Sequence, residues 1–110
     1  MPRNSQATCE LSPAARANLA RLGRDIGIAI KTREPYSRFA ERVGVSRPTL
    51  RKLISGDPGV SVGTIVAVLD TLGMLDHLHR VAAPENDQVG QSLRLQRHRP
   101  DEGLSMNTDF

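Results

Sequence analysis

Hydrophobic residues recur along residues 13–32 at the spacing of one helical face. Four aliphatic side chains follow one another at steps of three or four residues. They are Leu19, Leu22, Ile26 and Ile30. Ser12 followed by Pro13 is typical of a helix start, because proline is tolerated where the first N–H has no intrahelical partner. The pattern therefore predicts a first helix, in which Gly23 and Gly27 mark either a close helix contact or a bend.

Two short helices separated by a tight turn follow. Phe39 and Val43 lie four residues apart, and Gly44 is typical of the left-handed residue that ends a helix. Two residues later, Ser46 is placed to cap a further helix that ends near residue 55. The residues predicted to face inward from it are Leu50, Leu53 and Ile54. This spacing predicts a helix-turn-helix over residues 36–55.

The second half of the chain shows two more helical patterns and then loses them. Ser61 and Gly73 are placed to begin and end a fourth helix. Its predicted inward residues are Val62, Ile65, Val66, Leu69 and Leu72, and a short fifth helix carries Leu75, Leu78 and Val81. From Pro84 the chain is polar, although the alternation at Leu93-Arg94-Leu95 would suit a short strand. We expect a disordered leader at 1–11, a helical domain at 12–83 and a flexible tail at 84–110.

Composition and charge refine this picture. Apolar residues make up 38% of the 110-residue chain and aromatic residues only 3%, so one small core must be built from aliphatic side chains. Residues 1–56 carry eleven basic and four acidic side chains, a net charge of +7, whereas residues 57–110 carry four and eight, a net charge of −4. A basic surface in the first half favours nucleic acid as a partner.

Several function classes find no support in the sequence. Cys9 is the only cysteine, so neither an internal disulfide nor a cysteine-based zinc site is available. No apolar run approaches the ~18 residues of a membrane span, and the first ten residues lack the pattern of a signal peptide. The three histidines, His77, His79 and His98, have no ligand-spaced partners, and phosphate-loop and nucleophile motifs are absent. We expect a cytoplasmic protein without enzymatic activity, metal or cofactor.

The helix-turn-helix segment resembles a known family. The spacing of its apolar and small residues is similar to that of the Cro and phage-repressor class, also called the XRE family. The matching residues are Phe39, Ala40, Val43, Gly44, Val45, Leu50 and Leu53. The resemblance is tight over about 20 residues and loose from residue 12 to residue 81. It implies an all-α fold, a five-helix DNA-binding domain, in which the helix after the turn enters the major groove.

The DNA-facing residues follow partly from the pattern and partly from the resemblance. If Leu50, Leu53 and Ile54 point inward, the outward face of their helix carries three cations and a proline. The resemblance assigns the reading positions to Ser46, Arg47, Thr49, Arg51 and Lys52, with Pro48 or Thr49 beside a thymine methyl group. The start of the preceding helix, with Tyr36, Ser37 and Arg38, is expected to meet a phosphate. Arg33 and Arg42 are interpreted as solvated surface.

Two positions depart from the family pattern. Many members carry a glutamine where this chain has Tyr36, so its phosphate anchor must differ in detail. Many also pair an arginine on the first helix with a glutamate that ends the recognition helix. The corresponding positions here are Ile30 and Ile54, where an apolar contact would replace the ion pair without harm to the fold.

The expected partners are double-stranded DNA and a second copy of the chain. Proteins of this type bind two half-sites roughly 34 Å apart as homodimers, which predicts a near-palindromic operator. The dimer contact is expected in the last helices, around Leu75, Leu78 and Val81, or in the tail around Leu93 and Leu95.

A second resemblance concerns the segments at 56–61, 72–76 and 84–87, which look like those of HipB-type antitoxins. It implies a HipA-like kinase toxin as partner and repression of a shared operon, with the tail as a candidate toxin contact. A stand-alone or phage-type repressor explains the same core equally well. A protein-interaction module that has kept the fold without DNA binding is the other alternative.

Overall fold

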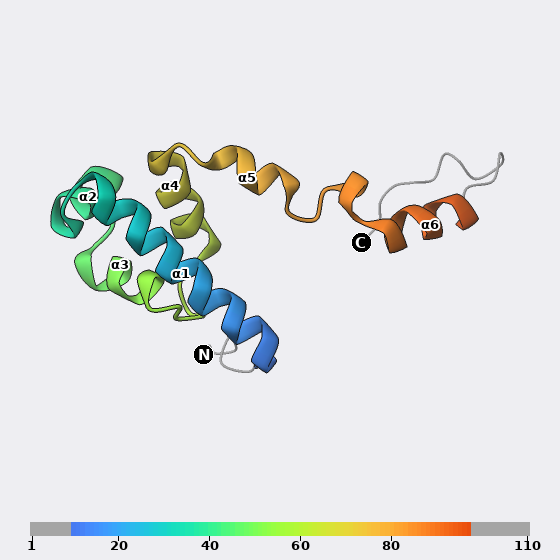
Figure 1. The fold of residues 1–110 in the computed structure, drawn as a ribbon, viewed down its shortest axis with the longest axis horizontal. Coiled ribbons are helices and arrows are strands. Elements are labelled where there is room, and N and C mark those ends of the chain that lie inside the picture. Colours follow the sequence, from blue (N-terminus) through green and yellow to red (C-terminus); the bar gives the residue numbers. More distant parts are fainter. Residues whose placement is uncertain (1–9, 98–110) are drawn as a thin grey trace, which may run out of the picture. The chain divides into compact units, whose positions relative to one another are not determined.

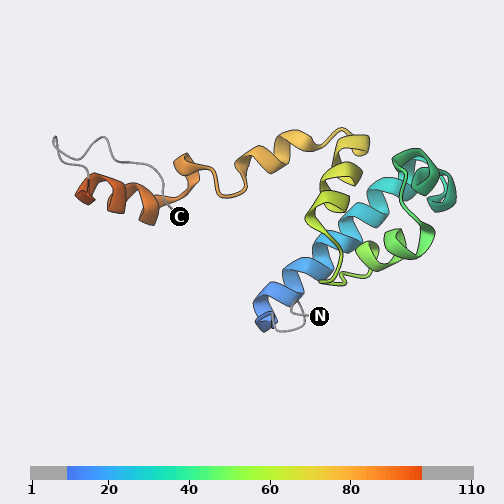
Figure 2. The same ribbon diagram turned by 180° about the vertical axis from the view of Figure 1, so that it is seen from behind.

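The computed structural model describes residues 10–97, and the regular structure in this range is entirely helical. Figure 1 shows the helices in chain order, and Figure 2 shows them from behind. They are α1 (Pro13–Arg33), α2 (Tyr36–Val43), α3 (Arg47–Ile54), α4 (Val62–Leu72), α5 (Leu75–Arg80), the short 3-10 helix η2 (Pro84–Asn86) and α6 (Gln88–Arg97). The all-α fold and the five expected helices are confirmed. Cys9, His98, most of the predicted leader and the end of the predicted tail lie outside the described residues.

The helix ends follow the local rules that predicted them. The Ser12 hydroxyl accepts a hydrogen bond from the N–H of Ala15 at 3.1 Å, so it caps the start of α1 as expected. Gly44 and Gly73 end α2 and α4 with φ of 89° and 78°, in the left-handed region that residues other than glycine rarely adopt. Short-range signals therefore fix where these helices begin and end.

The chain divides into two compact units between Leu75 and Asp76. In the first unit α1 is the central helix, and α2, α3 and α4 all contact it (Figure 1). Its core consists of aliphatic side chains and one phenylalanine, as the composition required. The most deeply buried side chains are Ile30, Phe39, Leu50, Leu53 and Val68.

The two glycines in α1 mark a close helix contact, and α1 is continuous across both of them. A Cβ atom on Gly23 would lie 2.5 Å from the carbonyl oxygen of Leu53, which is closer than real Cβ contacts. A Cβ atom on Gly27 would lie 2.9 Å from Cγ2 of Ile54. At Gly23 the backbone at the end of α3 therefore packs directly against the backbone of α1. At Gly27 the side chain of Ile54 packs against α1.

One residue of the apolar stripe on α1, Leu22, is exposed, and the prediction that Val62 points inward was wrong. Leu22 is 37% exposed, because the face of α1 that packs against α3 runs through its glycines and through Ile26 and Ile30. Val62 is 74% exposed, because it is the first residue of α4 and the buried face of that helix begins one turn later. Val68, which the sequence pattern did not single out, is fully buried in its place.

The second unit contains a helix where the sequence suggested a short strand. Leu93 and Leu95 lie within α6, and residues 84–97, expected to belong to a flexible tail, are largely helical. A carboxylate oxygen of Asp87 accepts a hydrogen bond from the N–H of Gly90 at 2.9 Å, which caps the start of α6. A strand would need a partner for its backbone groups, whereas a helix satisfies them within the segment. The side-chain amide of Gln91 also donates to the Pro84 carbonyl at 2.7 Å, joining α6 to η2.

Candidate nucleic-acid interface

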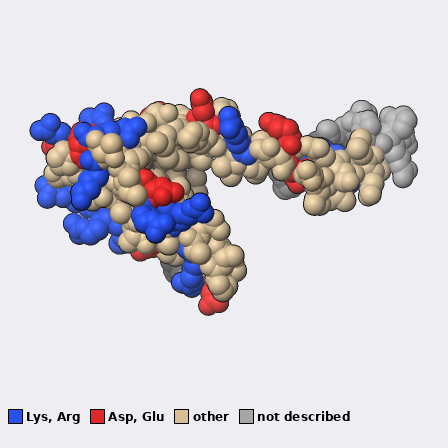
Figure 3. Space-filling model, viewed as in Figure 1, with Lys and Arg blue, Asp and Glu red and all other residues tan. Residues whose placement is uncertain are grey.

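The exposed face of α3 gathers most of the residues predicted to read DNA. Leu50 and Leu53 are buried on one side of the helix, so the opposite side faces solvent. Three of the predicted reading residues are exposed there, Arg47, Arg51 and Lys52, together with Pro48. Figure 3 shows basic side chains gathered over the part of the first unit that contains α2 and α3. Within residues 10–97 the side chains of Arg47, Arg51 and Lys52 form no ion pair, so their charges remain available.

Ser46 and Thr49 are held to each other at the start of α3. The Ser46 hydroxyl accepts from the N–H of Thr49 at 3.1 Å and donates to Oγ1 of Thr49 at 2.8 Å. At the start of α4 the Ser61 hydroxyl likewise accepts from the N–H of Thr64 at 3.1 Å, and the two hydroxyl oxygens lie 3.0 Å apart, so the chain caps two helices with a serine paired to a threonine. Among residues 10–97 the hydroxyl of Thr49 has no acceptor for its proton and can donate to an external one, whereas the hydroxyl proton of Ser46 is engaged.

The start of α2 offers backbone donors to an external anion. Its cap residue is Pro35, which makes no side-chain hydrogen bond to the helix. No acidic residue lies in the first turn of α2. Unsatisfied N–H groups and the positive end of the helix dipole attract anions such as phosphate. Ser37 is exposed at this position and adds a hydroxyl group.

Tyr36 is turned back toward α1. Its hydroxyl donates to the carbonyl oxygen of Gly27 at 3.3 Å, and the ammonium group of Lys31 lies 5.7 Å from the centre of its ring. The hydroxyl is therefore engaged within the protein, and the residue as a whole is 37% exposed. This contact could not be inferred from the sequence, since it depends on how closely Gly27 allows the neighbouring helices to approach.

Four predicted site residues come together around one hollow between α2 and α3. Tyr36, Ser37, Arg47 and Arg51 line a pocket of about 230 Å³, which we call the α2–α3 pocket. Leu50 and Ile54 complete its lining. Ile54 thus packs over Gly27 and borders this pocket, while Ile30 is fully buried. A second, more polar hollow of about 330 Å³ is lined in part by Arg38, Ser37 and Arg47.

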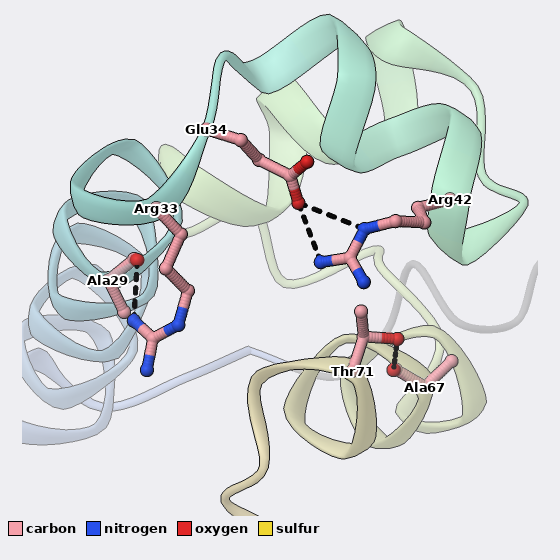
Figure 4. Close-up of polar contacts among 6 residues, drawn as sticks. All are labelled: Ala29, Arg33, Glu34, Arg42, Ala67 and Thr71. Carbon is pink, nitrogen blue, oxygen red and sulfur yellow. Dashed lines mark hydrogen bonds and ion pairs between the residues drawn. The ribbon is translucent and has the colours of Figure 1, made fainter.

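Arg42 and Arg33 form contacts within the protein (Figure 4). Two nitrogens of Arg42, Nε and Nη2, donate to the same carboxylate oxygen of Glu34 at 3.0 and 2.6 Å. The guanidinium carbon of Arg42 also lies 5.7 Å from the centre of the Phe39 ring. Arg33 donates to the carbonyl oxygen of Ala29 at 2.7 Å, one turn earlier in α1. Arg42 therefore links α2 to the end of α1, a role that the sequence did not reveal.

The fold and the site define a helix-turn-helix. Two short helices, α2 and α3, are joined by a turn at Gly44, and the outer face of the second helix is basic and exposed. In agreement with this geometry, residues 36–77 match a protein-family model described as helix-turn-helix. The matched segment runs from the start of α2 into α5. Neither a curated protein nor a solved structure matches the chain.

Other kinds of site find no structural counterpart in the part of the chain that is described. No group of three or more His, Cys, Asp or Glu side chains in residues 10–97 could hold a metal ion. Over the same residues, every helix is too short or too polar to cross a membrane. Within this range, the basic surface of α2 and α3 is the leading candidate for a binding site.

Proposed function

We propose that this protein is a sequence-specific DNA-binding transcriptional repressor. The observation that carries the proposal is the exposed face of α3, where three cations form no ion pair with any of residues 10–97 and lie beside a tight helix-helix turn. Helix-turn-helix proteins place the second helix in the major groove, with its N-terminal residues at base edges. Neutral or acidic residues at positions 47, 51 and 52 would instead have favoured an interaction module without DNA binding.

The residues divide into two roles in this proposal. Arg47, Arg51 and Lys52 donate to base edges or phosphates, and arginine is suited to the O6 and N7 atoms of guanine. Thr49 donates its free hydroxyl proton, and Pro48 offers an apolar contact to a thymine methyl group. The N-terminus of α2, with Ser37, holds a phosphate and so fixes the position of α3 on the duplex.

Two copies of the chain on a near-palindromic operator complete the proposal. One recognition helix of eight residues, α3, reads only a few base pairs, and two-fold symmetry doubles the contact. Apolar side chains that a second copy would cover are exposed in the second unit. The most exposed of them are Val81, Val89, Leu93 and Leu95.

DNA binding can be tested without knowledge of the operator. Immobilised full-length protein is used to select duplexes from a random library, and the selected duplex is titrated by fluorescence anisotropy at several salt concentrations. We expect one enriched sequence with two-fold symmetry. If about four phosphates are neutralised, affinity should fall roughly 100-fold between 50 and 200 mM salt, because binding releases counterions. Failure to enrich any sequence, or an affinity that salt leaves unchanged, would contradict the proposal.

A finer assignment, antitoxin of a HipA-like kinase, rests on the sequence resemblance of three short segments and stays a prediction. Residues 84–87, one of these segments, lie in η2 and just after it, where side chains are exposed. If the protein is an antitoxin, purification from its native cells should bring down a kinase that mass spectrometry identifies. Recovery of the protein without a kinase would favour the stand-alone repressor.

A further inference from the structure

The α2–α3 pocket has an apolar interior, although it opens on the basic surface. Leu50, which is only 2% exposed, lines the pocket together with Tyr36 and Ile54, and most of the lining surface is apolar. Contacts to phosphates and sugars are made by polar and charged groups, and such groups are already present on α3 and at the start of α2. The apolar interior is therefore not explained by contacts to the DNA backbone.

The volume of the pocket suits a small ring compound. A cavity of about 150 Å³ lined by aliphatic and aromatic side chains is large enough to hold benzene. The pocket measures about 230 Å³, so it has room for one six-membered ring and a short substituent. A thymine methyl group would fill only a small part of this space.

The rim of the pocket determines the charge of its occupant. Arg47 and Arg51 lie one helical turn apart on α3 and both line the pocket, together with the Ser37 hydroxyl. No acidic side chain is part of the lining, and within residues 10–97 the ion pair recorded is that of Arg42 with Glu34. Guanidinium groups bind carboxylates through paired hydrogen bonds and are always charged. The occupant that complements both rim and interior is a ring that carries a carboxylate.

We propose that the α2–α3 pocket binds a small aromatic carboxylate, with its ring against Leu50 and Ile54 and its carboxylate between Arg47 and Arg51. When the ligand is bound, Arg47 and Arg51 pair with its carboxylate and can no longer contact DNA. The ligand therefore competes with the operator and releases the repressor. This regulatory step rests on the proposed function, whereas binding of the carboxylate itself does not.

Benzoate is the probe for the pocket, and nuclear magnetic resonance of the full-length protein is the measurement. We expect saturable chemical-shift changes and nuclear Overhauser effects between the benzoate ring and the methyl groups of Leu50 and Ile54. Benzyl alcohol, which keeps the ring and lacks the charge, should bind at least about tenfold more weakly, because it forms neither the ion pair nor the paired hydrogen bonds that a carboxylate forms with arginine. Shifts spread over all Lys and Arg residues without contacts to these methyl groups would overturn the proposal, as would equal binding of benzyl alcohol.

A matched pair of variants separates the pocket from general attraction to a basic protein. Arg51→Leu removes one positive charge at the rim, and Arg24→Leu removes one from the exposed surface of α1, away from the pocket lining. We expect Arg51→Leu to weaken benzoate binding about tenfold, and Arg24→Leu to leave it within twofold. Equal losses in the two variants would mean that benzoate responds only to net charge and would contradict the proposal.

Competition with DNA tests the regulatory step. A fluorescein-labelled duplex of mixed sequence is bound at low salt, and benzoate or acetate is then added at equal ionic strength. We expect benzoate to release the duplex and acetate, which lacks the ring, to leave it bound. If benzoate occupies the pocket while the duplex stays bound, the competition is wrong. If no duplex binds before benzoate is added, the proposed function fails while the pocket assignment stands.

Discussion

Replacing Arg47, Arg51 and Lys52 together by alanine is expected to abolish sequence-specific DNA binding and to leave the fold intact. The three side chains are exposed and form no ion pair within residues 10–97, so the core does not depend on them. Each good contact to a base edge contributes ~1 to 3 kcal/mol, so the loss of three lowers affinity at least about 100-fold. A gel shift with the selected duplex measures the affinity, and circular dichroism verifies the fold.

The matched control removes the same charge from α1. Arg16→Ala/Arg21→Ala/Arg24→Ala takes three exposed arginines from outside the helix-turn-helix. We expect this variant to lose only the part of the affinity that depends on net charge and to keep its preference for the selected sequence. If the α3 variant still retains the duplex in the gel, the assignment of α3 as the recognition helix is wrong.

The largest expected effect on stability is that of Gly23→Ala. The added Cβ atom would lie 2.5 and 2.6 Å from the carbonyl oxygens of Leu53 and Ile54 and 3.0 Å from the backbone nitrogen of Gly56. These are backbone atoms, so relief requires α3 and the following turn to move away from α1. Overpacking of this kind costs ~1 to 3 kcal/mol, which outweighs the gain of up to about 1 kcal/mol that alanine brings in a helix. Urea denaturation should show a clear loss of unfolding free energy.

Gly63→Ala serves as the control for this prediction. Gly63 lies in the first turn of α4, and the nearest atom to an added Cβ would be the Ser61 hydroxyl oxygen at 3.9 Å, an ordinary contact. The same substitution is therefore expected to stabilise the protein by up to about 1 kcal/mol. Equal unfolding free energies for wild type and Gly23→Ala would contradict the prediction, because they would mean that α3 can move away from α1 at little cost.

The fold could be predicted from the sequence where the controlling interactions are local. Ser12, Ser46 and Ser61 cap helices, and Gly44 and Gly73 end them, because each acts on neighbours a few residues away. The burial of Val68 in place of Val62 could not be predicted, because apolar spacing along α4 does not reveal where the buried layer begins. The helix at Leu93 was missed for a related reason: two leucines that flank an arginine fit either periodicity over so short a stretch.

In the candidate site, too, the features set by local interactions could be predicted from the sequence, whereas those set by helix packing could not. The outward direction of Arg47 and Arg51 followed from the inward direction of their neighbours in the helix. The contact of Tyr36 with Gly27, the pairing of Arg42 with Glu34 and the α2–α3 pocket all depend on how α1 crosses the two helices. In the sequence, Gly27 indicated that another helix packs closely against α1. It did not indicate which residues of that helix make the contact.

The contact of α3 with the glycines of α1 has a consequence for how this protein changes over evolution. The orientation of α3 is fixed by its backbone and by buried residues such as Leu53, while its outer face takes no part in that contact. The atoms of α3 that contribute to stability are therefore separate from those that would read DNA under the proposed function. If α3 reads DNA as proposed, substitutions at positions 47, 51 and 52 would change the preferred DNA sequence without weakening the fold, so these three positions are where a new target sequence could be designed.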